Sequence, residues 1–245
     1  MSTRPNPIIV ALDVDSPDRA RALAGDLAGA VGAVKVGSQL FTAAGPDIVR
    51  QLTERGQRVF LDLKYHDIPN TVAGAAAEAA RLGAWMFDVH ASGGEAMMRA
   101  AREAAHEAAA AAGLPPPLVI AITVLTSFTP ATLASIGIDR PVLSQVEALA
   151  RLAGQAGLDG AVASPLEVGR LRQVCGSGFT LVTPGIRTAP PTDDGRDDQA
   201  RTLSGPEAVA AGASYVVVGR PIIAAPDPRA AAEALAASVG AELRR

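Results

Sequence analysis

Short apolar runs rich in Val, Ile and Leu alternate with longer alanine-rich segments along the whole chain. Continuous apolar runs of this kind are typical of strands that are buried on both faces. Cap residues and prolines mark the helix starts between them, as at 15–18. The predicted strands are 8–12, 33–37, 58–63, 85–90, 118–124, 160–163, 179–183 and 215–219. The predicted helices begin at 15–18, at 45–47 and after Pro69, and then cover 94–112, 142–156, 165–174, 206–211 and 227–239.

This alternation of strand and helix predicts an α/β protein with a parallel sheet. No linker-like stretch divides the chain, so we expect one domain over residues 1–245. Eight strand–helix units in 245 residues fit a closed (β/α)8 TIM barrel better than an open, doubly wound sheet. The open sheet remains the alternative, because the number of strands does not prove closure.

Polar residues gather where the predicted strands end, which is where barrels of this kind hold their active sites. The densest group lies at the end of the third strand, in the pattern Asp-x-Lys-x-x-Asp. Its members are Asp62, Lys64 and Asp67. Other strand ends contribute Asp13, Lys35, His90, Thr126, Arg187, Gly219 and Arg220.

Asp62 and Lys64 are two residues apart in a strand, so we expect both side chains to point into the barrel. Buried charges are costly unless each is paired, and a purely structural ion pair is one interpretation. Lys35 on the preceding strand and Asp67 in the loop favour a catalytic role instead. Flanking carboxylates favour the protonated form of a lysine, so Lys64 is better suited to donate a proton than to form a Schiff base.

The end of the eighth strand predicts a phosphate site. Gly219 allows close approach of the backbone, Arg220 offers a planar set of donors, and Arg187 adds a second cation. An ordinary turn with a surface arginine is the alternative. The polar loop that follows the seventh strand is long for a structureless segment, which predicts a phosphate-closing lid at 185–204.

Composition excludes several other classes of protein. Hydrophobic residues make up 49% and charged residues 19%, as in a folded globular protein. A net charge of −3 with few aromatic residues argues against nucleic-acid binding. Cys175 is the only cysteine, so neither an intrachain disulfide nor a thiolate metal cluster can form. No secretory signal or membrane-length apolar segment is visible, and we expect a cytoplasmic protein without a membrane partner.

The chain resembles the orotidine 5′-phosphate decarboxylases of the bacterial pyrimidine pathway. The resemblance rests on the segments 11–13, 35–37, 60–71, 89–94, 123–127, 181–187 and 218–221, and the block Asp-x-Lys-x-x-Asp-Ile-Pro-Asn-Thr is its most specific part. The shorter Asp-x-Lys-x-x-Asp pattern is also similar to metal-dependent sugar-phosphate decarboxylases and synthases. Those relatives carry an acidic ligand around the second strand, where this chain has Lys35.

The resemblance implies decarboxylation of orotidine 5′-phosphate to UMP and CO2, the last step of de novo pyrimidine nucleotide synthesis, with no metal and no cofactor. It implies that Lys64 protonates C6 of the pyrimidine and that Asp62 lies beside the substrate carboxylate. Lys35 and Asp67 would complete an alternating charge network. A metal-dependent sugar-phosphate enzyme and a catalytically silent phosphate-ligand sensor remain the alternatives.

The same resemblance implies the binding residues and the assembly. Asp13 and Lys35 would hold ribose hydroxyls, and Thr126 would contact the pyrimidine edge. Asp67 and Thr71 would reach the site of a neighbouring subunit, which implies a homodimer with shared active sites. The phosphate would be held by Gln199, Gly219 and Arg220, with Arg187 at the closing loop.

Overall fold

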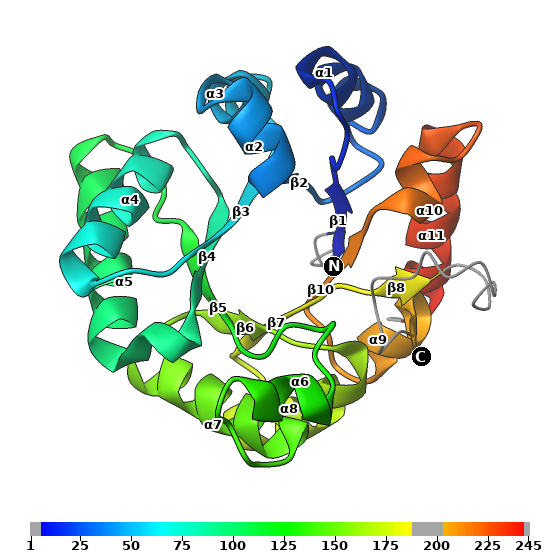
Figure 1. Cartoon of the computed structure of the whole chain (residues 1–245). Coiled ribbons are helices and arrows are strands. Elements are labelled where there is room, and N and C mark those ends of the chain that lie inside the picture. Colours follow the sequence, from blue (N-terminus) through cyan, green and yellow to red (C-terminus); the bar gives the residue numbers. More distant parts are fainter. Residues whose placement is uncertain (1–5, 188–202, 243–245) are drawn as a thin grey trace.

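The computed structural model describes residues 6–187 and 203–242. Within these ranges, eight parallel strands close into a barrel in the order β1-β10-β7-β6-β5-β4-β3-β2, and helices surround it (Figure 1). The predicted TIM barrel is therefore confirmed, and the open sheet is wrong. The barrel strands are β1 Ile8–Ala11, β2 Ala33–Gly37, β3 Val59–Tyr65, β4 Met86–His90, β5 Leu118–Ile122, β6 Gly160–Val162, β7 Thr180–Thr183 and β10 Tyr215–Val218.

The helices follow the strands in chain order. The predicted start of the first helix is confirmed, since Ser16 accepts a hydrogen bond from the Arg19 amide and Pro17 occupies the first turn. The longer helices are α1 Pro17–Asp26, α3 Asp47–Glu54, α4 Pro69–Arg81, α5 Gly94–Ala111, α7 Val142–Gln155, α8 Val168–Cys175 and α11 Pro228–Glu242. The shorter ones are α2 Ser38–Ala44, α6 Pro130–Ser135, α9 Gly205–Ala210, α10 Arg220–Ile223 and the 3-10 turns η1 Ala91–Gly93 and η2 Pro165–Glu167.

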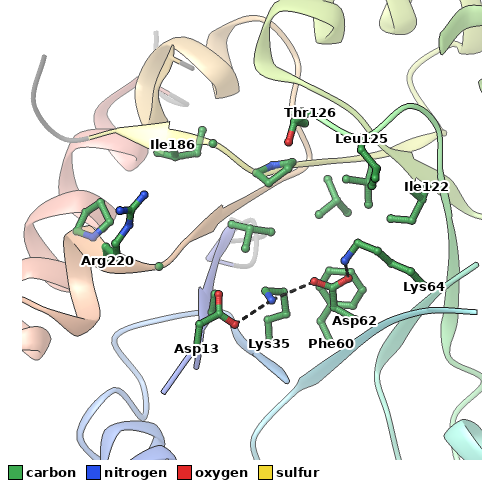
Figure 2. Close-up of a pocket in the computed structure, with 18 of the residues that line it drawn as sticks. Asp13, Lys35, Phe60, Asp62, Lys64, Ile122, Leu125, Thr126, Ile186 and Arg220 are labelled. Carbon is green, nitrogen blue, oxygen red and sulfur yellow. Dashed lines mark hydrogen bonds and ion pairs between the residues drawn. The ribbon is translucent and has the colours of Figure 1, made fainter. Parts of the chain in front are cut away.

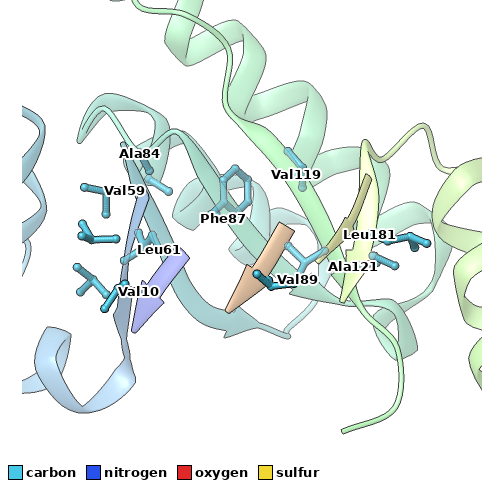
Figure 3. Packing of buried hydrophobic residues seen from close by; sticks show 14 of the residues in the cluster. Val10, Val59, Leu61, Ala84, Phe87, Val89, Val119, Ala121 and Leu181 are labelled. Carbon is cyan, nitrogen blue, oxygen red and sulfur yellow. The ribbon is translucent and has the colours of Figure 1, made fainter. Parts of the chain in front are cut away.

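Two hydrophobic cores result from the alternation of side chains along the strands. One fills the barrel interior, where Phe60, Met86 and Ile120 pack together. The other lies between the barrel and the helices and contains Leu61 and Phe87 (Figure 3). Neighbouring residues of one strand therefore serve different cores, which explains why the strands read as continuous apolar runs.

The predicted lid falls mostly outside the described residues. Its ends form a separate parallel pair of short strands, β8 Ile186–Arg187 and β9 Leu203–Ser204. Ser204 then caps α9, and Glu207 completes a reciprocal capping box with it. Closure over a phosphate stays a prediction.

Candidate active site

A cavity of about 310 Å³ opens at the carboxyl ends of the barrel strands. Pockets for small ligands in proteins start at roughly this size. Three of the predicted residues enter the cavity from different parts of the barrel: Asp13 follows β1, Lys35 belongs to β2, and Thr126 follows β5. The predicted site residues that line it are Asp13, Lys35, Asp62, Lys64, Thr126, Gly219 and Arg220.

The charged residues of the cavity form a chain of alternating sign (Figure 2). The Lys35 ammonium lies 3.3 Å from Asp13 Oδ1 and 3.0 Å from Asp62 Oδ2. The Lys64 ammonium pairs with the other oxygen of Asp62. The side chains of Lys35 and Asp62 are only 11% and 12% exposed, whereas Lys64 is 36% exposed. The inner pair is thus removed from water, and the Lys64 ammonium remains open to the cavity.

This pairing sets the charge states of the two buried groups. Burial by itself raises the pKa of Asp62, but the charge of Lys35, a hydrogen bond with Asp88 and the charge of Lys64 hold that pKa well below its usual range. Burial lowers the pKa of Lys35, and the charges of Asp62 and Asp13 outweigh it and raise the pKa above its ordinary value. Both groups are therefore fixed in their charged forms at neutral pH.

Lys64 reaches Asp62 through a break in the regular strand. Leu61 pairs with Phe87 and Tyr65 pairs with Val89, so the register of β3 against β4 shifts between them. Lys64 itself has a positive φ of 54°, which non-glycine residues seldom adopt. The two side chains do meet, as predicted. Strict alternation along the strand is the wrong reason, however, because a bulge re-aims Lys64.

Asp88 of β4 lies behind this bulge and is not among the site residues predicted from the sequence. Its side chain is fully buried, and its Oδ1 accepts a hydrogen bond of 2.7 Å from the Lys64 amide. Tyr65 also responds to Asp88, because burial and the charge of Asp88 raise the pKa of Tyr65 to about 12. An aspartate inside an otherwise apolar strand was the signal that could have identified it.

Apolar side chains form a second wall of the cavity. They come from β5, β6, β7 and β10 and from the loops after them, and none of them was predicted as a site residue. Such a wall suits the flat face of a heterocyclic base better than a flexible polar chain. Its members include Ile122, Leu125, Val162, Val182 and Val217.

Two residues of the predicted phosphate site, Gly219 and Arg220, lie at the other end of the cavity. Gly219 follows β10, and Arg220 begins the short helix α10. Figure 2 shows Arg220 and Lys64 at opposite ends of the site, with Ile122 and Leu125 of the apolar wall on the Lys64 side. The arrangement can hold an elongated anionic ligand whose two ends face different cations.

Two of the remaining predicted site residues lie outside the cavity, and two cannot be assigned to it from the described part of the structure. Asp67 and Thr71 are exposed and do not line the cavity of their own chain. Asp67 Oδ1 accepts a hydrogen bond of 2.6 Å from the Ile68 amide. Arg187 belongs to β8, but its side chain is outside the described part of the structure, as is all of Gln199.

Two further observations concern residues of weaker functional promise. The rings of His66 and His90 lie 5.4 Å apart, and burial, together with the charges of His66 and Lys64, lowers the pKa of His90. Burial raises the pKa of the Cys175 thiol, which suits a structural role.

Among residues 6–187 and 203–242, no three His, Cys, Asp or Glu side chains cluster as a metal-ligand set. No helix in the same ranges is long and apolar enough to cross a membrane.

Comparison with known proteins assigns the chain to a family. Residues 6–235 match the sequence profile of the Orotidine 5′-phosphate decarboxylase / HUMPS family. The chain is 52% identical over 236 residues to an orotidine 5′-phosphate decarboxylase of Syntrophotalea carbinolica, covering 96% of each protein. It is 53% identical over 233 residues to that of Moorella thermoacetica, covering 95% of this chain and 91% of the relative.

Solved structures agree with this assignment. The crystal structure of orotidine 5′-phosphate decarboxylase from Lactobacillus acidophilus superposes with a TM-score of 0.85 at 39% identity, covering 96% of this chain and 99% of the other. The profile match, the two relatives and the shared barrel lead to one conclusion. The chain belongs to the orotidine 5′-phosphate decarboxylase / HUMPS family.

Proposed function

We propose that this chain removes CO2 from orotidine 5′-phosphate to give uridine 5′-phosphate, without a metal or cofactor, as the last step of de novo pyrimidine nucleotide synthesis in the cytoplasm. One observation carries the proposal beyond family membership. It is the alternating chain Asp13–Lys35–Asp62–Lys64, which ends in an ammonium group that faces an apolar-walled cavity.

The reaction needs a fixed cation at the carbon that loses CO2. When the bond between C6 and the carboxylate breaks, the electron pair stays on C6 in the plane of the ring, where the π system cannot delocalise it. Preorganised charge in a site that excludes water stabilises such a carbanion most effectively. The Lys64 ammonium supplies this charge and then transfers one proton to C6, and water returns the proton to Lys64.

Asp62 gives the substrate carboxylate an unfavourable neighbour. Its low pKa keeps it ionised beside the position where that carboxylate would lie. The like-charge contact is present in the bound substrate and disappears as neutral CO2 leaves, so it raises the ground state more than the transition state. Lys35 keeps Asp62 in place during this step, because it is the more buried of its two partners.

The remaining contacts bind and orient the nucleotide. Arg220 holds the phosphate by charge-assisted hydrogen bonds, with Gly219 beside it. Thr126 contacts the pyrimidine edge, while Asp13 and Lys35 contact the ribose hydroxyls. Gln199 and Arg187 would complete the phosphate site when the 185–204 segment closes.

A homodimer with shared active sites is part of the proposal. Asp67 and Thr71 lie on the surface outside their own cavity, and exposed Ile68 lies between them. Residues placed in this way can act on the cavity of a second copy. Each site would then combine Lys35, Asp62 and Lys64 of one subunit with Asp67 and Thr71 of the other.

The positions of the cavity carboxylates favour this reaction over a metal-dependent sugar-phosphate one. Lys35 engages both Asp13 and Asp62, so a divalent cation would have to displace a buried ammonium to use them together. Carboxylates that bind such ions need free oxygen lone pairs directed at the metal.

Turnover of orotidine 5′-phosphate tests the proposal. We expect the enzyme to remain active in the presence of EDTA, so that the ultraviolet absorbance of orotidine 5′-phosphate still falls as it is consumed. Uridine 5′-phosphate formed in D2O should carry deuterium at C6. Lys64→Ala should lower kcat by about a thousandfold or more, because it removes both the fixed charge and the proton donor. Arg81→Ala is the matched control, since it removes a surface cation paired with Glu78 outside the cavity.

Each contrary result identifies an alternative. Activity that chelation abolishes and magnesium restores would favour the metal-dependent enzyme. Tight binding of the nucleotide without turnover would favour a phosphate-ligand sensor. Unchanged turnover in Lys64→Ala would reject the mechanism.

A further inference from the structure

Asp88 occupies an unusual position for a carboxyl group. It lies two residues after Met86 on β4, so its side chain also points into the barrel interior, and no part of that side chain reaches solvent. It does not line the cavity that contains Lys64. A group placed in this way cannot touch a substrate, and its burial is costly unless another interaction compensates for it.

The first such interaction is with the backbone of Lys64. Between the paired residues Leu61 and Tyr65, β3 contains Asp62, Leu63 and Lys64, whereas β4 contains only Asp88 between the corresponding partners. The Lys64 amide therefore lacks a partner on the neighbouring backbone, and Asp88 Oδ1 accepts its hydrogen bond at 2.7 Å. Lys64 is also the one non-glycine residue with a positive φ in the described ranges. The carboxyl group thus holds Lys64 in a conformation that the chain seldom adopts.

The second interaction is with Asp62. Asp88 Oδ2 is buried and has no hydrogen-bond partner among N–H and O–H donors within the described part of the chain. Asp62 acts on Asp88 through its charge and through a side-chain hydrogen bond. A hydrogen bond between two carboxyl groups requires a proton on one of them, because ionised carboxylates only accept. Asp62 already pairs with Lys35 and Lys64, so it retains the negative charge and the proton belongs to Asp88.

We propose that Asp88 is a positioning residue for Lys64 and acts as a neutral acid, its Oδ1 fixing the Lys64 backbone and its protonated Oδ2 donating to Asp62. The proposal deepens the decarboxylase function and rests on it for the role of Lys64. The surroundings of Asp88 support the neutral state. Burial and the charge of Asp62 raise the pKa of Asp88 well above its ordinary value, and the charge of Lys64 and its amide hydrogen bond oppose them only in part.

The groups around Asp88 come from three strands. β3 contributes Asp62, Lys64 and Tyr65, of which only Asp62 and Lys64 carry charge at neutral pH. β5 places the apolar residue Ile120 directly opposite Asp88. On β4 itself, His90 lies two residues further along, and its pKa is lowered by burial first, so it is neutral at neutral pH. Lys64 is the cation with the largest effect on Asp88 within the residues described.

The neutral state has a consequence for catalysis. An ionised Asp88 would place a second negative charge behind Lys64 and Asp62, and added negative charge makes an ammonium a weaker proton donor. A neutral Asp88 fixes Lys64 without this effect. It therefore affects the rate of the chemical step more than the binding of substrate.

Two substitutions separate the proposed role from a merely structural one. Asp88→Asn keeps an oxygen for the Lys64 amide and a donor for Asp62, and so mimics the neutral acid. Asp88→Val removes both. We expect Asp88→Val to lower kcat by about a hundredfold, as expected for a misplaced catalytic group, with a much smaller change in KM. Asp88→Asn should recover most of that loss.

Asp159→Asn is the matched control. Asp159 Oδ2 also accepts a backbone hydrogen bond, 2.8 Å from the Val119 amide, but lies outside the cavity. It should change neither kcat nor KM. An Asp88→Asn variant as impaired as Asp88→Val would overturn the neutral-acid proposal.

A second measurement needs no turnover. Lys35 and Lys64 are the only lysines in the chain, so [15N]lysine labelling gives two backbone amide signals, and Lys35→Arg assigns them. The Lys64 signal should move in Asp88→Val, because its hydrogen-bond acceptor is lost. In the wild-type protein it should show no titration step near pH 4, the ordinary pKa of an aspartate (about 3.9).

A step near pH 4 in the wild-type protein, absent from Asp88→Asn, would overturn the neutral state of Asp88. An unmoved Lys64 signal in Asp88→Val would overturn the positioning role. If the Lys64 signal behaves as expected while orotidine 5′-phosphate is not turned over, the positioning stands and the proposed function fails. The two claims can therefore be rejected separately.

Discussion

Removal of the Lys35 ammonium should destabilise the fold in a way that depends on pH. Lys35→Met keeps most of the buried stem but leaves the nearly buried Asp62 with only its more exposed partner, Lys64. Breaking a buried ion pair by removing one partner costs about 3–5 kcal/mol. In a domain of this size each kcal/mol lowers Tm by roughly 2–4 °C, so the melting temperature should fall by about 6–20 °C at neutral pH.

The pH dependence follows from the direction of the Asp62 pKa shift. In the wild-type protein the folded-state pKa is lowered, so the stabilisation is fully present above the ordinary carboxyl pKa and is lost only as pH falls through the folded value. Without Lys35, burial dominates and raises that pKa, so the variant loses stability as pH rises from acid towards neutrality. The difference in the free energy of unfolding should be greatest at neutral pH and should narrow as the pH is lowered.

Urea unfolding can be followed by the fluorescence of Trp85, the only tryptophan, which packs against Arg58 and Tyr215 away from the site. Lys64→Met is the matched control: it removes the more exposed partner of Asp62 and should cost about 1 kcal/mol or less. Adding Asp62→Asn to Lys35→Met should restore part of the loss, because the uncompensated charge disappears. A difference that is constant with pH, or an equal loss in Lys64→Met, would refute the reasoning.

Three further predictions concern the phosphate site, the assembly and the barrel. Arg220→Ala should lower kcat/KM for orotidine 5′-phosphate by a factor that corresponds to about 1.5–3 kcal/mol, and should leave kcat/KM for the unphosphorylated nucleoside nearly unchanged. Equal effects on both substrates would argue against a phosphate contact. Lys64→Ala and Asp67→Ala should each be nearly inactive, but a mixture of the two should recover roughly a quarter of wild-type activity. Random pairing makes half of the dimers heterodimers, and each heterodimer has one intact site out of two. No recovery after demonstrated subunit exchange would reject shared sites. Gly160→Ala should lower Tm strongly, because its Cβ would lie 2.0 Å from the Thr180 carbonyl oxygen; an unchanged Tm would show that the two strands can separate there without cost.

Most of the fold was predictable because the barrel strands are largely apolar on both faces, with charged residues at only a few inward positions. Three short helices were not predicted from the sequence: α2 and α6 lack that kind of signal, and α10 spans only four residues. Only Leu40 is buried in α2 and only Leu133 in α6, so neither helix has an apolar stripe that could be detected as a period. The predicted end of the third strand at residue 63 was also too early, because the bulge carries the strand on to Tyr65.

Site residues at strand ends were predictable for a different reason. Parallel strands bring their carboxyl ends to one rim, so Asp13, Lys35 and Arg220 could be grouped from sequence position alone. Asp88 could not be found in this way, because it lies below the rim among apolar residues. Its position follows from the same alternation that turns Met86 inward, and a charged residue at such a position needs a specific partner.

The choice of lysine in this cavity follows from what its cations have to do. Every other basic side chain apart from the histidines is arginine, and Arg220 stands where a planar set of donors suits a phosphate. A guanidinium group retains its proton throughout the accessible pH range, so it could not act as the proposed proton donor to C6. An ammonium group is a compact point charge that can give up a proton and regain it. The chain therefore has lysine at the two positions that form the buried charge chain with Asp62, and one of them, Lys64, is held by Asp88 in the conformation that directs it into the cavity.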